Sequence, residues 1–254
     1  MTLCVYAIVR ARPGRIGVTG LAGERLHAVT AGPIAAIVGR LRAAPRPSEA
    51  TVRAYDRTVR SLARRVPALL PARFGTCVRG EDELRAILGD REPALRRALA
   101  AVRDRVQMTV RIVDRGSGIG DQGSGIGDRG SGIGSRKPEP DSDRSQIPDP
   151  RSLIPDPRSP GRSYLKARAA AAARERAVPA FEPLRPAVQR WVRAERVEKR
   201  GDVATLYHLV PRRVADRYRG ALEKAARDAN VRLLVSGPWP AYAFADGWQV
   251  AGDG

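Results

Sequence analysis

Residues 114–160 constrain the fold more than any other stretch, because they cannot form a packed core. Three copies of a seven-residue unit containing Gly-Ser-Gly-Ile-Gly occupy 115–121, 122–128 and 129–135. Two copies of a second unit, which ends in Ile-Pro-Asp-Pro, occupy 144–150 and 151–157. These units hold few apolar residues among many glycines, prolines and charges, so burial cannot offset the entropy of ordering them. We expect a disordered low-complexity insertion, with the folded structure built from the sequence on either side.

One false motif lies inside this insertion. Residues 118–123 satisfy G-x-G-x-x-G and follow a predicted strand. A dinucleotide site also needs a helix that opens at the third glycine and points its N-terminus at the pyrophosphate. Another repeat follows instead, so we reject a nucleotide site and expect no cofactor.

The charge of the chain raises the question of an acidic partner. The formal net charge is +19. The insertion has seven basic and eight acidic residues, a net charge of −1, which leaves +20 on the rest. Such a balance is typical of nucleic-acid binding or of an acidic protein partner. Arg53, Arg57, Arg60 and Arg64 fall on the polar face of the predicted helix after Ser48, which favours a solvated surface there, and we weigh nucleic acid as the lesser alternative.

The N-terminal part predicts strands, a helix, a strand and two more helices. A buried strand is expected at 3–9 and a strand pair at 26–29 and 34–38. Ser48 suits the N-cap of an amphipathic helix that Pro67 ends. A strand follows at 69–78, then helices at 81–88 and from Pro93, and then an alternating strand at 106–113.

The C-terminal part predicts a modified ferredoxin-like arrangement. Helices are expected at 164–177 and from about Pro186 to Glu195, then a strand at 203–210, a helix at 213–230 and a strand at 231–235. With the strand at 106–113, this order fits a ferredoxin-like fold whose insertion follows its first strand. The predicted fold class is α+β, with an N-terminal α+β domain at 1–105 and a C-terminal ferredoxin-like domain at 106–254, interrupted at 114–160.

The sequence offers no recognisable catalytic or metal-binding arrangement. The two histidines, His27 and His208, are widely separated from each other and from Cys4 and Cys77, so no zinc pattern exists. We predict that both histidines are structural and that the two cysteines are separate buried thiols of a reducing compartment. The apolar runs are too short for a membrane span, and Cys4–Val9 is too short for a signal peptide.

Two motifs concentrate the candidate binding residues. The first is Leu-Leu-Pro-Ala-Arg-Phe-Gly-Thr at 69–76, in which Arg73 could meet a partner or form an internal ion pair. The second is Ser-Gly-Pro-Trp-Pro-Ala-Tyr-Ala-Phe at 236–244, which gathers three aromatic rings in a chain with only 5% aromatic residues. These rings could pack onto the core, dock a partner, or do both.

The two motifs and their spacing resemble the gas vesicle protein F/L family (GvpL/GvpF). Further matches in the same order are Val-Tyr-Ala-Ile-Val at 5–9, Val-Gln-Met-Thr-Val-Arg-Ile at 106–112, Ser-Tyr-Leu-Lys-Ala-Arg at 163–168 and Leu-Tyr-His-Leu-Val-Pro at 206–211. The resemblance covers nearly the whole chain except residues 114–160.

The resemblance implies a non-enzymatic accessory or minor structural protein, located at the gas vesicle in the cytoplasm. Its expected partners are the small, very apolar shell protein and other gas vesicle accessory proteins, with no small-molecule substrate and no membrane. An edge strand and aromatic rings on a soluble carrier suit a strand-forming, insoluble partner. The candidate partner-binding residues are Arg73, Phe74, Gly75, Thr76, Gly237, Pro238, Trp239, Pro240, Tyr242 and Phe244.

The alternative function is a basic ferredoxin-like RNA-binding module. Such modules carry aromatic residues in the middle of strands on an open sheet. The predicted strands at 106–113 and 231–235 contain none. The sequence therefore favours the gas vesicle interpretation.

Overall fold

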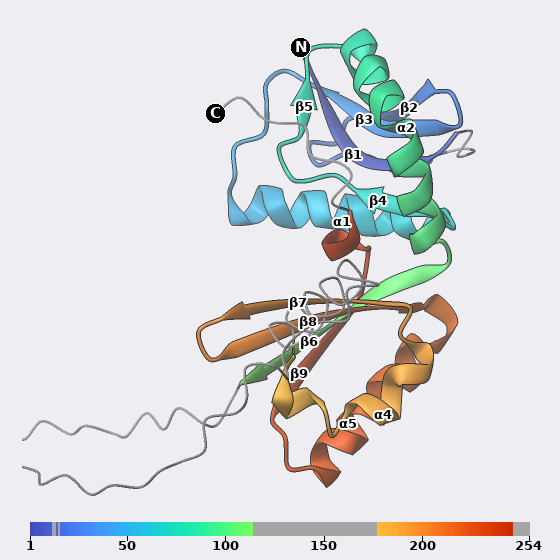
Figure 1. Ribbon diagram of the computed structural model, residues 1–254. Helices are drawn as coiled ribbons and strands as arrows, with labels where there is room; N and C mark the ends of the chain where they lie inside the picture. The colour runs from blue at the N-terminus through green and yellow to red at the C-terminus, as the bar shows by residue number, and fades with distance from the viewer. Residues whose placement is uncertain (12–13, 15, 114–176, 246–254) are drawn as a thin grey trace, which may run out of the picture. The chain divides into compact units, whose positions relative to one another are not determined.

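The computed structural model describes residues 1–11, 14, 16–113 and 177–245 (Figure 1). By their contacts, the described residues on the two sides of the insertion belong to one compact unit. The predicted disordered insertion and the G-x-G-x-x-G match lie outside the described residues, as does the helix expected at 164–177 except for its last residue. The domain boundary near residue 105 stays a prediction.

The N-terminal sheet is antiparallel and has the strand order β2-β3-β1-β4, with β5 also paired to β1. Its strands are β1 (Thr2–Arg10), β2 (Leu26–Ala31), β3 (Ile34–Leu41), β4 (Leu69–Pro71) and β5 (Cys77–Val78). This confirms the buried first strand and the strand pair that follows it. The predicted strand at 69–78 is instead two short strands with a turn between them.

Helices α1 (Glu49–Arg65) and α2 (Glu81–Val102) pack against different residues of β1. Tyr6 and Val9 share a core with α1, whereas Val5 and Ile8 share one with α2. Side chains alternate along a strand, and the irregularity between Val5 and Ala7 shifts this alternation by one residue. Both faces of β1 are therefore covered, and the strand is apolar from Leu3 to Val9 apart from the Tyr6 hydroxyl.

The helix boundaries agree with the sequence at α1 and differ at α2. Ser48 caps α1 and forms a capping box with Thr51. The two helices expected at 81–88 and from Pro93 are one helix, with Pro93 inside it. A proline removes one backbone hydrogen bond, but the leucine stripe continues past it onto the sheet. The stripe comprises Leu84, Leu88, Leu95 and Leu99.

The C-terminal sheet is also antiparallel, with the order β7-β8-β6-β9. Its strands are β6 (Arg105–Val113), β7 (Ala194–Arg200), β8 (Val203–Pro211) and β9 (Leu233–Trp239). Helices α4 (Arg185–Val188) and α5 (Ala215–Asp228) lie on one side of this sheet (Figure 1). The predicted α+β class is therefore confirmed, and the strand order is that of a ferredoxin-like sheet.

Strand β7 was missed by the sequence analysis. The helix expected from Pro186 to Glu195 is only the short α4, a 3-10 turn η3 (Gln189–Trp191) and the start of β7. The strand consists of Ala-Glu-Arg-Val-Glu-Lys-Arg, residues that favour helices, and its pairing with β8 overrides this preference. Strand β9 likewise continues to Trp239 instead of ending at Val235, through a cis Gly237–Pro238 bond.

Cys4 and Cys77 form a disulfide, which corrects the expectation of two separate thiols. The two residues are partners in the pairing of β1 with β5, so the fold places them directly opposite each other. Their separation of 73 residues hid this pairing in the sequence.

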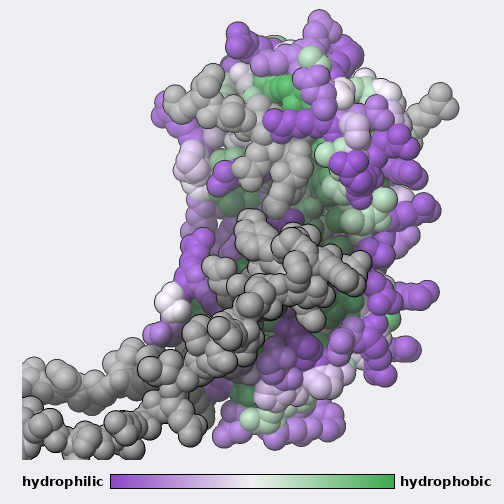
Figure 2. Space-filling view, in the orientation of Figure 1, coloured by the Kyte–Doolittle hydropathy of each residue, from purple (hydrophilic) through white to green (hydrophobic). Residues whose placement is uncertain are grey.

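Hydrophilic side chains cover most of the visible described surface, with smaller hydrophobic areas between them (Figure 2). Among the helices of the described residues, none has the length and apolar character needed to cross a membrane.

Candidate partner-binding site

The Arg-Phe-Gly-Thr motif forms a turn between β4 and β5. The Thr76 amide donates to the Arg73 carbonyl at 3.1 Å, and Gly75 adopts φ +82°. A left-handed conformation at this position favours glycine, so the turn explains this residue of the motif. The Thr76 carbonyl in turn accepts from the Val5 amide at 2.9 Å, which fastens the turn to β1.

Phe74 anchors this turn to helix α1. Its ring meets the Tyr55 ring edge-on, with centroids 5.5 Å apart, and Tyr55 stacks on Tyr6 at 5.0 Å. The Tyr55 hydroxyl lies 2.9 Å from the Ala72 carbonyl, to which it donates. Burial raises the pKa of Tyr55 well above its ordinary value, so it remains a hydrogen-bond donor.

Residues 237–244 pass from β9 into a 3-10 turn, η5 (Tyr242–Phe244), and also contact α1. The Tyr242 hydroxyl donates to Asp56 Oδ1 at 2.9 Å. The Arg60 guanidinium lies over the Trp239 ring, 3.9 Å from its centroid. Burial and the neighbouring Asp56 carboxylate raise the pKa of Tyr242 above its ordinary value.

Both motifs therefore contact one helix within the compact unit. Tyr55 contacts the first motif, while Asp56 and Arg60 contact the second. Sequence reasoning missed Asp56 and Arg60, because they belong to a helix whose polar face resembles any solvated surface. Only the tertiary contacts identify them.

The ten candidate residues differ in their exposure. Arg73, Gly75, Pro238 and Tyr242 are exposed, whereas Phe74, Gly237, Trp239 and Phe244 are half-buried. Thr76 and Pro240 are buried. The exposed residues are available to a partner, while the buried ones support the backbone around them.

Gln107 of β6 holds the second motif in place through a hydrogen bond to its backbone. Its Oε1 accepts from the Ala243 amide at 2.7 Å, and its Nε2 donates to Thr109 Oγ1 at 3.2 Å. Gln107 is one of the few buried polar residues, and these bonds satisfy its amide.

Elsewhere, His208 joins β8 to β7 and α5. Its Nε2 lies 2.8 Å from Glu195 Oε2, and its Nδ1 lies 2.5 Å from the Tyr218 hydroxyl. The contact with His208, supported by Arg185, lowers the pKa of Glu195 to about 2, although burial opposes this. His208 is fully buried and closed to a substrate, so its position agrees with a structural role.

His27 of β2 has a partly exposed side chain, and its Nε2 lies 3.4 Å from Glu81 Oε1. Glu81 also accepts from Arg40 and Arg85, so the histidine belongs to a surface charge cluster. The described residues include no group of three or more His, Cys, Asp or Glu side chains that could hold a metal ion.

Comparison with known proteins gives one consistent result. Residues 2–246 match the sequence model of a protein family whose description is gas vesicle synthesis protein GvpL/GvpF. No curated protein matches the sequence.

Two solved structures share the fold. The crystal structure of gas vesicle protein GvpF from Anabaena sp. PCC7120 is 11% identical, with a TM-score of 0.61, and the match covers 98% of this chain and 99% of that one. GvpF from Microcystis aeruginosa is also 11% identical, with a TM-score of 0.64 over 96% of this chain and 98% of that one. At this identity the likeness shows the fold alone.

Proposed function

Because this chain belongs to the GvpL/GvpF family of gas vesicle synthesis proteins, we propose that it is a non-enzymatic accessory protein that binds the small apolar shell protein during vesicle assembly. The observation that carries the proposal is the family match, which extends over residues 2–246 and includes both motifs. The proposed location is the gas vesicle within the cytoplasm, and other accessory proteins are further proposed partners.

The surroundings of the two motifs support this role. The first motif lies where β4 and β5 pair with β1 at one edge of the N-terminal sheet. Arg73 and Tyr242 are exposed there, and both turns are fastened to α1. Exposed residues on a rigid backbone suit partner binding, because little conformational entropy is lost when the complex forms.

The proposal is tested by co-expressing the chain with the small shell protein of the same organism and recovering it from soluble lysate. We expect the wild-type chain to recover the shell protein. The variants Arg73→Glu and Tyr242→Ala should recover much less, because each alters an exposed side chain of the candidate site.

The matched control is Arg97→Glu, which makes the same charge change at an exposed position of α2. It should recover the shell protein as the wild type does. Circular dichroism checks that each variant is folded. Failure of the folded wild-type chain to recover any shell protein would refute the proposal, and equal losses in all three variants would refute the assignment of the site.

A further inference from the structure

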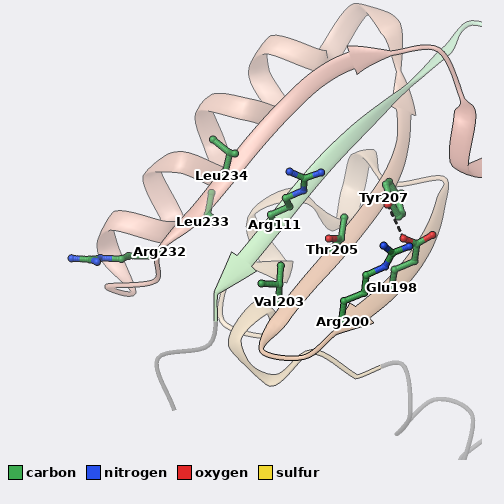
Figure 3. Close-up of a pocket in the computed structure, with 9 residues that line it drawn as sticks. All are labelled: Arg111, Glu198, Arg200, Val203, Thr205, Tyr207, Arg232, Leu233 and Leu234. Carbon is green, nitrogen blue, oxygen red and sulfur yellow. Dashed lines mark hydrogen bonds between the residues drawn. The ribbon is translucent and has the colours of Figure 1, made fainter. Parts of the chain in front are cut away.

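The face of the C-terminal sheet opposite α5 is covered at the end that holds the buried Gln107, and its other end contains a second surface with binding character. Side chains of β6, β7, β8 and β9 line a hollow of about 720 Å³ there (Figure 3). Its lining includes Arg111, Glu198, Arg200, Thr205, Tyr207 and Leu234. The hollow is on the side away from α5, since the neighbours Val110 and Ile112 point into the core that α5 shares.

Two guanidinium groups give this surface its charge. Arg111 and Arg200 are exposed, and no hydrogen bond or ion pair joins either of them to another residue in the part of the chain that the structure describes. Both lie close enough to Tyr207 to affect its phenol: burial and Glu198 raise the pKa of Tyr207, and the two arginines oppose this. Arg232, at the rim, points away from the others (Figure 3).

The nearest acid cannot neutralise both cations. Glu198 accepts a hydrogen bond from the Tyr207 hydroxyl at 2.9 Å, so one of its oxygens is already engaged (Figure 3). Among the described lining residues, a single carboxylate faces two guanidiniums, each of which can hold a carboxylate through two hydrogen bonds. The guanidinium groups of Arg111 and Arg200 can therefore form ion pairs with further anionic groups.

An apolar component accompanies the charge. Leu234 is 62% exposed, and it belongs to the same hollow as the half-buried Val203. Covering an exposed leucine with a partner is favourable, because its apolar surface is removed from water. The lining thus combines cations with an uncovered aliphatic side chain.

We propose that this face binds an extended acidic segment of a partner protein, whose carboxylates pair with Arg111 and Arg200 while an apolar side chain covers Leu234. Charge complementarity favours this occupant. RNA fits less well, because Tyr207 is the one aromatic side chain among the described lining residues, whereas sheets that bind RNA stack several bases on aromatic rings. None of the ten candidate residues takes part, so the inference extends beyond the proposed shell-protein site and is tested apart from it.

The test measures binding of a fluorescein-labelled synthetic peptide of repeating Glu-Leu-Glu-Ser units to the full chain by fluorescence anisotropy. We expect the double variant Arg111→Glu/Arg200→Glu to weaken binding about tenfold or more, because two charge-assisted pairs are lost. Leu234→Ser should weaken it several-fold through the lost apolar contact.

The control is Arg57→Glu/Arg97→Glu, which makes the same charge change at exposed positions of α1 and α2. It should retain nearly the wild-type affinity, and circular dichroism should show that all variants are folded. Equal weakening in both double variants would overturn the proposal, since net charge alone would then explain binding. So would the absence of peptide binding, or tighter binding of labelled oligouridine that depends on Arg111 and Arg200.

Discussion

At the scale of single residues, Gly237 has little freedom to change, because both its backbone conformation and its close backbone neighbour restrict it. Its φ is +120°, and a Cβ atom built there would lie 2.7 Å from the Gln107 carbonyl oxygen. The Gly237 carbonyl also accepts from Arg219 of α5. A side chain at this position would therefore strain the backbone and push β9 away from β6.

We predict that Gly237→Ala lowers the free energy of unfolding by about 2 kcal/mol or more, from backbone strain and steric overlap together. Gly220→Ala is the matched control, because Gly220 lies in α5 with no atom within 4 Å of the added Cβ. That change should raise stability by about 0.5–1 kcal/mol. Urea denaturation of both variants measures the difference, and equal effects of the two changes would contradict this explanation.

Glu195 is an acid whose ionisation is tied to the fold, because His208 and Arg185 lower its pKa. Its pKa of about 2 in the folded state lies below the ordinary value of 4.5. Its contribution is therefore fully present above pH 4.5 and is lost as the pH falls through 2. Glu195 is partly exposed, and solvent screens its ion pairs, so we expect its contribution to be well under the full value of the pKa shift.

We predict that Glu195→Gln reduces the fall in unfolding free energy between pH 4.5 and pH 2. Glu223→Gln, which alters an exposed acid of α5, should keep the wild-type fall. Guanidinium denaturation across this pH range gives the comparison. A wild-type slope in Glu195→Gln would show that the contact with His208 does not control acid stability.

At the scale of elements, the disulfide between Cys4 and Cys77 ties the short strand β5 to β1. Strand β5 has only two residues, so its own pairing contributes few hydrogen bonds. The cross-link instead restricts the unfolded chain between the two cysteines. The turn that carries Arg73 and Phe74 directly precedes it in sequence.

Reduction is predicted to lower the free energy of unfolding by about 2–4 kcal/mol. Calorimetry with and without dithiothreitol measures this as a lower melting temperature for the wild-type chain. The double variant Cys4→Ala/Cys77→Ala should melt at a lower temperature than the oxidised wild type and should not respond to the reductant. A response of the variant equal to that of the wild type would exclude the disulfide as the cause.

At the scale of the whole molecule, the net charge of +19 opposes the compact state. Like charges on one folded body repel each other, and salt screens this repulsion over a Debye length. Several arginines of the helices are exposed, among them Arg57, Arg97 and Arg217.

We therefore predict that the melting temperature rises as salt is added from low to physiological concentration. A variant with Gln at positions 57, 97 and 217 should melt higher at low salt and show a smaller rise, because it has less repulsion to screen. Differential scanning fluorimetry over a salt series measures both. A melting temperature that falls with salt would mean that attractive ion pairs dominate.

The sequence by itself determined the features that depend on local pattern. The apolar run of β1, the stripe and N-cap of α1 and the alternation of β6 are visible without a partner, because periodicity and capping are properties of neighbouring residues. The order of elements and the motifs at 69–76 and 236–244 were enough to indicate the family, which the match over residues 2–246 confirms.

Tertiary structure alone decided the features that join distant residues. Strand β7 exists because β8 pairs with it, and α2 continues through Pro93 because its leucines on both sides pack on the sheet. The disulfide, the contacts of Asp56 and Arg60 with the second motif, and the hollow between Arg111 and Arg200 follow from pairings far apart in sequence. Local propensity differs by less than about 1 kcal/mol per residue among most residue types, so packing and pairing between elements determine these outcomes.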